Sequence, residues 1–178
     1  MKAKSIGRCD TNISTMKRNK KYGIIDIGSN SVRGRAFADG KIIYNELFTT
    51  RLGSGLANGS ELTEKSIQDT VKAIKNLVGG FKKAEVGEIY AFATEAVRSA
   101  TNGKNFVGLV KNETGIDVDV VNGDEEGELA LLGAVGMDDG GVIDIGGASA
   151  EISVVKSGKI IYSHSLPLGA VRLYGKCG

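Results

Sequence analysis

The sequence contains very little histidine or cysteine, on which many catalytic and metal sites depend. Its one histidine is His164, and its two cysteines, Cys9 and Cys177, stand near opposite ends of the 178-residue chain. This spacing is unlike that of a zinc site or a redox motif, and His164 falls within a strand-like pattern. No run of about 18 apolar residues occurs, and the N-terminus lacks the apolar segment of a signal peptide. Chemistry would therefore depend on carboxylates, hydroxyls, backbone amides, Arg and Lys, and we expect a cytoplasmic protein with no membrane contact.

Positive charge is scarce outside the N-terminus. The chain has 23 basic and 21 acidic residues. Residues 1–21 contain seven of the basic residues and one of the acidic ones, so the remainder has 16 basic and 20 acidic residues and a net charge of −4. This acidic balance argues against general nucleic-acid binding, so we expect no DNA partner. We interpret residues 1–20 as a disordered or non-native leader.

An internal repeat is the most informative feature that is present. When the chain is shifted by 118 residues, so that Asp26 falls on Asp144, residues 23–44 align without gaps with residues 141–162, and half of the positions are identical. Both segments read as a strand ending in an acid, a glycine turn, a returning strand and a Gly-Lys hairpin into a third strand. The fixed offset predicts a duplicated domain whose halves face one ligand. Two unrelated hairpins with similar turns are the alternative.

The remaining pattern predicts an α/β fold in which helices cover a mixed sheet. Three strands are expected first, and a Gly- and Ser-rich loop at residues 51–60 follows them. Strands and helices then alternate, an order that predicts three antiparallel strands joined to parallel ones. The expected elements are strands at 22–27, 32–38, 42–49, 88–93 and 117–121, and helices from the cap Thr63 through Phe81, at 103–114 and at 125–135.

The turn Asp-Ile-Gly-Ser-Asn-Ser at residues 26–31 has the composition of an anion-binding loop. Successive amides in such a turn form a concavity for an anion, and hydroxyl groups add donors. For one copy alone, a polar turn whose side chains are satisfied locally is the alternative. The second copy, Asp-Ile-Gly-Gly-Ala-Ser at residues 144–149, favours two facing loops that hold a phosphate chain between them.

Five segments together resemble the exopolyphosphatase and guanosine pentaphosphate phosphatase (Ppx/GppA) family. They are DIGSNSVR at 26–33, ATEAVRSATN at 93–102, NGDEEGEL at 122–129, DIGGASAE at 144–151 and LGAVRL at 168–173. The resemblance implies the ribonuclease H-like fold of actin, Hsp70 and sugar kinases, duplicated, with the second copy incomplete. The first actin-like domain would span residues 21–138, and residues 139–178 would hold the first three strands of the second. It also implies hydrolysis of phosphoanhydride bonds with a divalent metal, normally Mg²⁺.

The resemblance assigns roles to individual residues. Glu126 would deprotonate the attacking water with Glu125 in support, and Arg98 would neutralise phosphoryl oxygens. Asp144 and Glu151 would be the metal-side carboxylates. Stabilisation of a helix dipole is the alternative for the acids of residues 125–126, and a surface ion pair is the alternative for Arg98. The expected phosphate-binding residues are Asp26, Gly28, Ser29, Asn30, Ser31, Arg98, Gly146, Gly147, Ala148 and Ser149.

Three positions depart from the family pattern, and the substrate stays open. Ala148 replaces the third glycine of the second loop, Ala150 replaces a threonine, and Gly127 replaces an alanine. We expect the methyl group of Ala148 to narrow the approach of phosphate. Polyphosphate and guanosine pentaphosphate (pppGpp) are the expected substrates. An ATP-binding kinase or ATPase of the actin-like superfamily and a non-catalytic phosphate-binding half-domain are the alternatives.

We expect no helix to follow the three strands after residue 141 and cover their sheet. Their apolar side chains, among them Ile143, Ile145 and Ile161, would then be exposed, and exposed apolar surface of this kind marks partner sites. We therefore expect the chain to be the N-terminal portion of a longer protein or to form a homodimer through residues 142–167. We also expect the chain alone to hydrolyse polyphosphate poorly.

Overall fold

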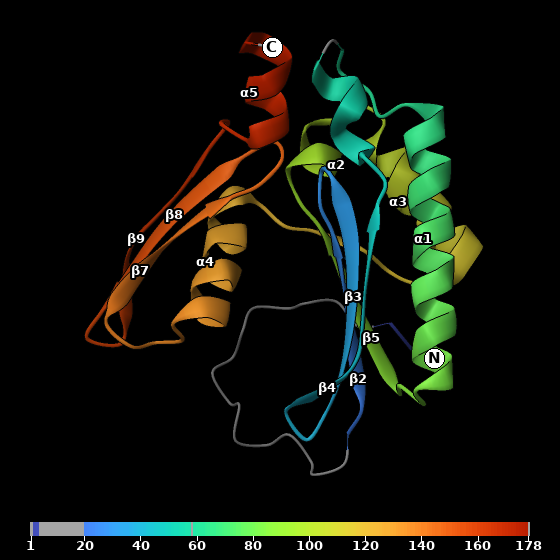
Figure 1. The fold of residues 1–178 in the computed structure, drawn as a ribbon, viewed down its shortest axis with the longest axis horizontal. Coiled ribbons are helices and arrows are strands. Elements are labelled where there is room, and N and C mark those ends of the chain that lie inside the picture. Colours follow the sequence, from blue (N-terminus) through green and yellow to red (C-terminus); the bar gives the residue numbers. More distant parts are fainter. Residues whose placement is uncertain (1, 4–19, 58, 178) are drawn as a thin grey trace.

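The computed structural model describes residues 2–3, 20–57 and 59–177, which form two sheets and the helices around them (Figure 1). The first sheet has six strands in the order β1-β5-β2-β3-β4, with β6 paired to β5, and the second has the order β7-β8-β9. The strands are β1 (Lys2–Ala3), β2 (Tyr22–Ile27), β3 (Ser31–Ala38), β4 (Lys41–Thr49), β5 (Glu88–Ala93), β6 (Asp119–Val120), β7 (Gly140–Ile145), β8 (Ala150–Lys156) and β9 (Lys159–Leu166). The helices are the 3-10 helix η2 (Leu52–Ala57), α1 (Glu64–Lys83), α2 (Glu95–Ser99), α3 (Gly103–Thr114), α4 (Gly123–Ala134) and α5 (Ala170–Cys177).

The first sheet is mixed, as the sequence predicts. Strands β2, β3 and β4 are antiparallel neighbours, whereas β5 runs parallel to β2 and β6 runs parallel to β5. Alternate residues of β2, including Ile25 and Ile27, are fully buried in the core shared with α1 and α3. Gly23 and Gly34 let α1 lie close to the strands, because a Cβ at either position would meet the side chain of Phe81 or Leu77. The predicted fold class, a ribonuclease H-like mixed sheet with helices, is confirmed.

Helix α1 begins after the predicted cap, although it ends at Lys83 rather than Phe81, and helix α3 has both predicted ends. The side-chain oxygen of Thr63 accepts a hydrogen bond of 3.2 Å from the backbone N–H of Ser66. This satisfies one of the free donors at the start of α1. Gly115 follows α3 with φ of 74°, and its N–H donates to the carbonyl of Lys111. A left-handed residue there favours glycine, which has no Cβ to clash.

Helix α4 packs against the second sheet. It contacts β7, β8 and β9, and Figure 1 shows it between the two sheets. The strands present small polar groups to it, and the hydroxyls of Ser153 and Ser163 lie 3.0 Å apart. A Cβ added to Gly127 would lie 2.7 Å from each of these hydroxyls, so glycine permits the close approach of the helix. We call β1–β6 with α1–α3 the first lobe, and α4 with β7–β9 the second lobe.

The hairpins of the two lobes repeat each other in detail. Residues 39–40 and residues 157–158, which are 118 positions apart, both form tight turns with positive φ at each residue. The pairing of the second and third strands shifts register after Ala36 in the first lobe and after Val154 in the second. These positions are also 118 residues apart, so the repeat extends to the same bulge.

Three short helical elements differ from the prediction. The expected loop at 51–60 contains η2, and α2 follows β5 directly. The expectation that no helix follows the last strand is wrong, because residues 170–177 form α5. The backbone N–H groups of Ala170 and Val171 donate to the carbonyls of Gly146 and Gly147. A contact between segments so far apart holds the first turn of α5, and local sequence does not show it.

The start of α4 also differs from the prediction. The helix expected at 125–135 begins two residues earlier, at Gly123, directly after Asn122. The side chain of Asn122 accepts a hydrogen bond of 3.0 Å from the N–H of Glu125, and Glu125 Oε2 accepts one of 2.9 Å from the N–H of Asn122. This reciprocal pair is a capping box, with asparagine in the place of the more familiar serine or threonine.

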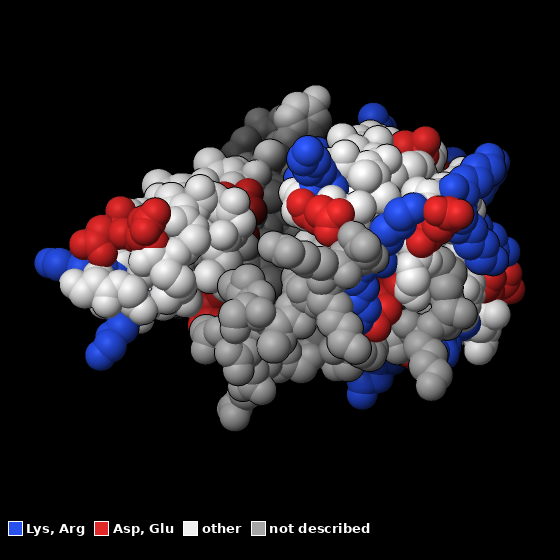
Figure 2. All heavy atoms as spheres, turned by 90° about the horizontal axis from the view of Figure 1, so that it is seen from below, with Lys and Arg blue, Asp and Glu red and all other residues white. Residues whose placement is uncertain are grey.

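One face of the second sheet carries exposed apolar side chains. Ile143, Ile145 and Ile161 are 69%, 67% and 60% exposed. The helix that follows these strands, α5, contacts η2, and these three side chains stay exposed. Seen from below, the second lobe shows a largely uncharged surface with charged side chains gathered at its far tip (Figure 2). The homodimer through residues 142–167 stays a prediction.

Within the described parts of the chain, no helix is both long enough and apolar enough to cross a membrane.

Candidate active site

A cavity of about 380 Å³ lies where the two repeated loops meet. We call residues 28–31, after β2, the first loop, and residues 146–149, after β7, the second loop. A Cβ added to Gly147 would lie 3.3 Å from the Cβ of Ser29 and 3.6 Å from that of Asn30, so the loops touch across the two lobes. The cavity is lined by Asp26, Gly28, Ser29, Asn30, Ser31, Phe92, Thr94, Glu126, Leu129, Ala130, Asp144, Gly146, Gly147, Ala148 and Ser149.

Both loops are closed by the same backbone hydrogen bond. The N–H of Gly28 donates to the carbonyl of Ser31 at 3.0 Å, and the N–H of Gly146 donates to the carbonyl of Ser149 at 2.9 Å. Loops of this kind direct successive amides to one side and form a concavity that binds anions. Both loops line the same cavity, so their remaining amides and their hydroxyls are candidate donors to one anion.

Each loop accepts a backbone hydrogen bond from a helix at an equivalent position. The carbonyl of Ser29 accepts a hydrogen bond of 2.8 Å from the N–H of Gly53 in η2. The carbonyl of Gly147 accepts one of 2.8 Å from the N–H of Val171 in α5. Both pairs are 118 residues apart, so η2 and α5 have matching roles in the repeat.

Two aspartates from the ends of equivalent strands share the cavity. Burial raises the pKa of Asp26 to about 6, the negative charge of Asp144 adds to this, and Arg33 and Arg35 oppose it. Repulsion between two carboxylates on one cavity is relieved when a cation or a proton lies between them. Asp26 and Asp144 are therefore candidate ligands for a cation.

Glu126 lies in the first turn of α4 and reaches the same cavity. Its Oε2 is 3.4 Å from Nη1 and 3.5 Å from Nη2 of Arg98. Burial raises the pKa of Glu126 to about 7, the charge of Glu151 adds to this, and hydrogen bonds from Arg98 and Thr94 act in the opposite direction. A carboxylate whose pKa lies near neutrality can accept a proton during a reaction and release it afterwards.

Comparison with known proteins identifies the family. Residues 32–177 match the Ppx/GppA phosphatase family. The chain belongs to this family. The bifunctional 3-dehydroquinate synthase/phosphatase of Fusobacterium nucleatum is 31% identical, and the alignment covers 92% of this chain and 27% of that protein. Exopolyphosphatase 1 of Mycobacterium tuberculosis is 28% identical, with 86% of this chain and 47% of that protein covered. The chain thus spans less than half the length of these curated relatives.

A solved structure shows the same arrangement of elements. The exopolyphosphatase from Cytophaga hutchinsonii superposes with a TM-score of 0.81 and 28% sequence identity. The match covers 88% of this chain and 53% of that one. The two lobes and the loops between them therefore have the Ppx/GppA fold, over about half of the length of that solved protein.

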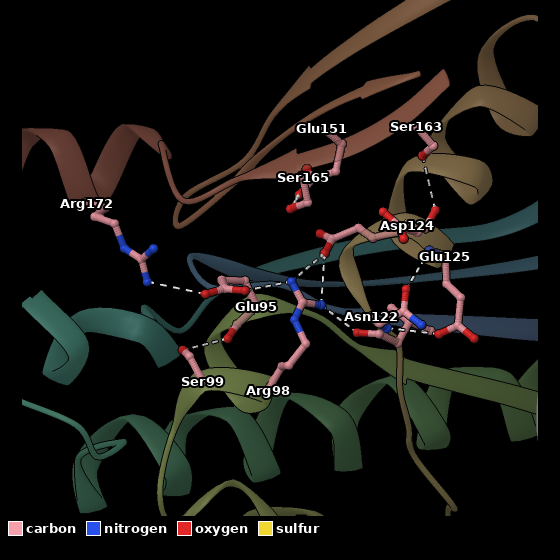
Figure 3. Close-up of polar contacts among 12 residues, drawn as sticks. Glu95, Arg98, Ser99, Asn122, Asp124, Glu125, Glu151, Ser163, Ser165 and Arg172 are labelled. Carbon is pink, nitrogen blue, oxygen red and sulfur yellow. Dashed lines mark hydrogen bonds and ion pairs between the residues drawn. The ribbon is translucent and has the colours of Figure 1, made fainter. Parts of the chain in front are cut away.

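Three residues that the Ppx/GppA resemblance assigns to the site are outside the cavity lining. Glu125 belongs to the capping box at the start of α4. Glu151 is only 2% exposed, and its Oε1 accepts a hydrogen bond of 2.7 Å from the hydroxyl of Ser165 (Figure 3). Arg98 lies behind Glu126 and also donates to the carbonyl of Val121. Their catalytic and metal-binding roles stay predictions.

Sequence reasoning missed two charged residues beside this site, Glu95 and Arg172. Glu95 Oε2 lies 2.6 Å from Nη2 of Arg98, and Glu95 Oε1 lies 3.4 Å from Nη2 of Arg172 (Figure 3). Both residues belong to Ppx/GppA motifs, at 93–102 and 168–173, and this position within a motif is the signal that could have identified them. Their pairing joins positions 77 residues apart, which the sequence alone does not reveal. The apolar lining residue Leu129 stands three positions after Glu126, and helical spacing could have identified it.

Proposed function

We propose that this chain carries the catalytic cleft of a phosphatase that hydrolyses the terminal phosphoanhydride bond of inorganic polyphosphate or guanosine pentaphosphate. The observation that carries the proposal is the contact between the two equivalent loops on a cavity that Glu126 also lines. A chain of phosphates presents anionic oxygens on both sides, and each loop offers amides and hydroxyls to one side. Membership of the Ppx/GppA family and the exopolyphosphatases among its relatives support the same reaction.

The residues on the cavity suit an attack by water on the terminal phosphorus. Glu126 accepts a proton from the water as the new P–O bond forms. The anhydride P–O bond breaks, and its electron pair stays on the bridging oxygen of the remaining chain. The products are orthophosphate and a chain that is one phosphate shorter. Arg98 holds the Glu126 carboxylate and brings positive charge close to the reacting phosphoryl group.

The donor groups on the cavity fit a divalent cation that has few protein ligands. The described residues contain no group of three or more His, Cys, Asp or Glu that could hold a metal. Asp26 and Asp144 nevertheless face one cavity, and Glu151 is the strand partner of Asp144 in the register of β7 and β8. Mg²⁺ usually keeps several waters and binds one or two carboxylates together with phosphate oxygens. Asp144 and Asp26 would hold the Mg²⁺ ion, and Glu151 would support Asp144 from the neighbouring strand. The ion would neutralise negative charge on the phosphates.

Phosphate release in the presence of Mg²⁺ tests the proposal, with polyphosphate, guanosine pentaphosphate and ATP as separate substrates. We expect Glu126→Gln to lower the rate by about 10² to 10⁴ while leaving the affinity for polyphosphate nearly unchanged. Glu128→Gln is the matched control, because Glu128 stands on the same helix and is exposed.

Each other outcome contradicts the proposal in a different way. A Glu126→Gln protein that keeps its rate would show that Glu126 is only a charge at a helix terminus. Transfer of phosphate from ATP to an acceptor without release would favour the kinase alternative. Tight binding of polyphosphate without any release would favour the phosphate-binding half-domain. A cytoplasmic location stays a prediction.

A further inference from the structure

Glu95 lies between two arginines that come from different parts of the fold. Its Oε2 is 2.6 Å from Nη2 of Arg98 on the same helix, and its Oε1 is 3.4 Å from Nη2 of Arg172 on α5 (Figure 3). The side chains of Arg98, Glu95 and Arg172 are 24%, 17% and 24% exposed, so the three are largely shielded from water. Shielded ion pairs are screened less than surface pairs and fix the geometry of the groups that they join.

Arg172 contacts the second loop with its backbone and the first lobe with its side chain. Its N–H donates to the carbonyl of Gly147 at 3.1 Å. Its guanidinium reaches Glu95, at the start of the helix that follows β5. One residue therefore connects the backbone of the second loop to the first lobe.

Arg98 continues this connection to the proposed catalytic base. Its Nη1 donates to the carbonyl of Val121 and lies 3.4 Å from Oε2 of Glu126, while its Nη2 contacts Glu95. A guanidinium is a rigid planar fork, so moving one of its partners turns the whole group. The path runs from Gly147 through Arg172, Glu95 and Arg98 to Glu126.

We propose that Glu95 and Arg172 are positioning residues that set Arg98, and through it Glu126, relative to the second loop. The inference rests on the proposed function, because it assumes that the second loop holds the phosphate that Glu126 serves. Reacting groups must be placed within a fraction of an ångström, and small displacements slow a reaction strongly. A loss of Arg172 would thus act at Glu126 without removing any group that touches the substrate.

The test compares Arg172→Ala, Arg172→Lys and Glu95→Gln with the control Lys75→Ala. Lys75 also forms an ion pair, with Glu113 at 2.6 Å, but this pair joins two helices within the first lobe. The first readout is the Nε–Hε resonance of Arg98 in ¹H–¹⁵N NMR spectra, assigned as the resonance that Arg98→Lys removes. The second is the steady-state hydrolysis of inorganic tripolyphosphate with Mg²⁺.

We expect Arg172→Ala and Glu95→Gln to shift or broaden the Arg98 resonance, and Arg172→Lys to restore part of the change. We expect kcat to fall about tenfold in Arg172→Ala, with KM changed less than about twofold, because only positioning is lost. Lys75→Ala should match the wild type in both readouts. An Arg98 resonance that is the same in wild type, Arg172→Ala and Glu95→Gln would overturn the proposal.

The NMR readout needs no turnover, so it separates this proposal from the proposed function. If the wild type releases no phosphate but Arg172→Ala still shifts the Arg98 resonance, the proposed function fails while the structural connection stands. If the wild type is active and Arg172→Ala lowers affinity instead of kcat, Arg172 binds substrate directly and the positioning role is wrong. A thermal unfolding curve for each variant identifies loss of fold, in which case Glu95→Gln, which is nearly isosteric, carries the test.

Discussion

The two lobes contain the same strand sequence in two different surroundings. Ile25 and Ile27 of β2 are fully buried, whereas the repeat-equivalent Ile143 and Ile145 of β7 are 69% and 67% exposed. The strands, turns, bulge and loop hydrogen bonds correspond, so local structure does not explain the difference. The first lobe has α1 on this face, and in the second lobe α4 lies on the opposite face.

The comparison shows that the loop geometry does not depend on how the sheet is covered. The Gly28 and Gly146 turns close in the same way although only one of their strands has a full core behind it. Short-range hydrogen bonds set the shape of a loop, whereas burial of apolar surface sets most of the stability. We therefore expect substitutions at equivalent positions to differ strongly in their effect on stability and little in their effect on loop shape.

The largest difference is expected between Ile25→Ala and Ile143→Ala. Ile25→Ala leaves a cavity in a filled core and should lower the free energy of unfolding by about 2–5 kcal/mol. Ile143→Ala removes side-chain atoms that are already mostly in water, so its effect should stay within about 0.5 kcal/mol. Urea unfolding of both variants under the same conditions measures the difference. Equal losses would mean that something covers β7 in solution.

A smaller difference in stability is expected for the glycines that stand two positions before these isoleucines, Gly23 and Gly141. A Cβ at Gly23 would lie 2.7 Å from the ring of Phe81, whereas a Cβ at Gly141 would lie 3.3 Å from the carbonyl of Ser153. Gly23→Ala should lower the free energy of unfolding by about 1–3 kcal/mol because Phe81 is fixed in the core. Gly141→Ala should cost less than about 1 kcal/mol by the same principle. Thermal unfolding of the pair checks this, and a larger loss at Gly141 would contradict it.

A third difference concerns pH and the two aspartates. Burial raises the pKa of Asp26 to about 6, so between pH about 4 and about 6 the folded state keeps a proton that the unfolded state has lost. The free energy of unfolding should therefore fall as the pH rises through this range. Asp26→Asn should remove this fall and raise the free energy of unfolding at pH 7 by about 3 kcal/mol, since one pKa unit corresponds to about 1.4 kcal/mol.

Asp144→Asn should have the same sign and a smaller size, because it removes only the repulsion that Asp144 exerts on Asp26. Urea unfolding at pH 4 and pH 7, with a chelator to exclude divalent cations, measures both effects. Asp26→Asn that is less stable than the wild type at pH 7 would contradict the proposed origin of the raised pKa.

The sequence predicts well the parts that depend on neighbours along the chain. The 118-residue offset locates both loops, and Thr63 and Gly115 mark helix ends through contacts within four residues. It fails for α5, whose first turn is held by carbonyls of residues 146–147 more than twenty positions earlier. The pairing of Glu95 with Arg172 could not be predicted for the same reason, because the two residues are far apart in the chain.

Residues 1 and 4–19 of the expected leader lie outside the described residues, while Lys2–Ala3 pair with β5.

The central claim is that the two loops bind one phosphate chain together. Titration of ¹⁵N-labelled protein with inorganic tripolyphosphate and Mg²⁺, followed by ¹H–¹⁵N NMR, tests it most directly. We expect the amide resonances of residues 28–31 and 146–149 to shift together, with one shared Kd and saturation at one equivalent. Shifts confined to one loop, or two loops that saturate at different concentrations, would contradict it.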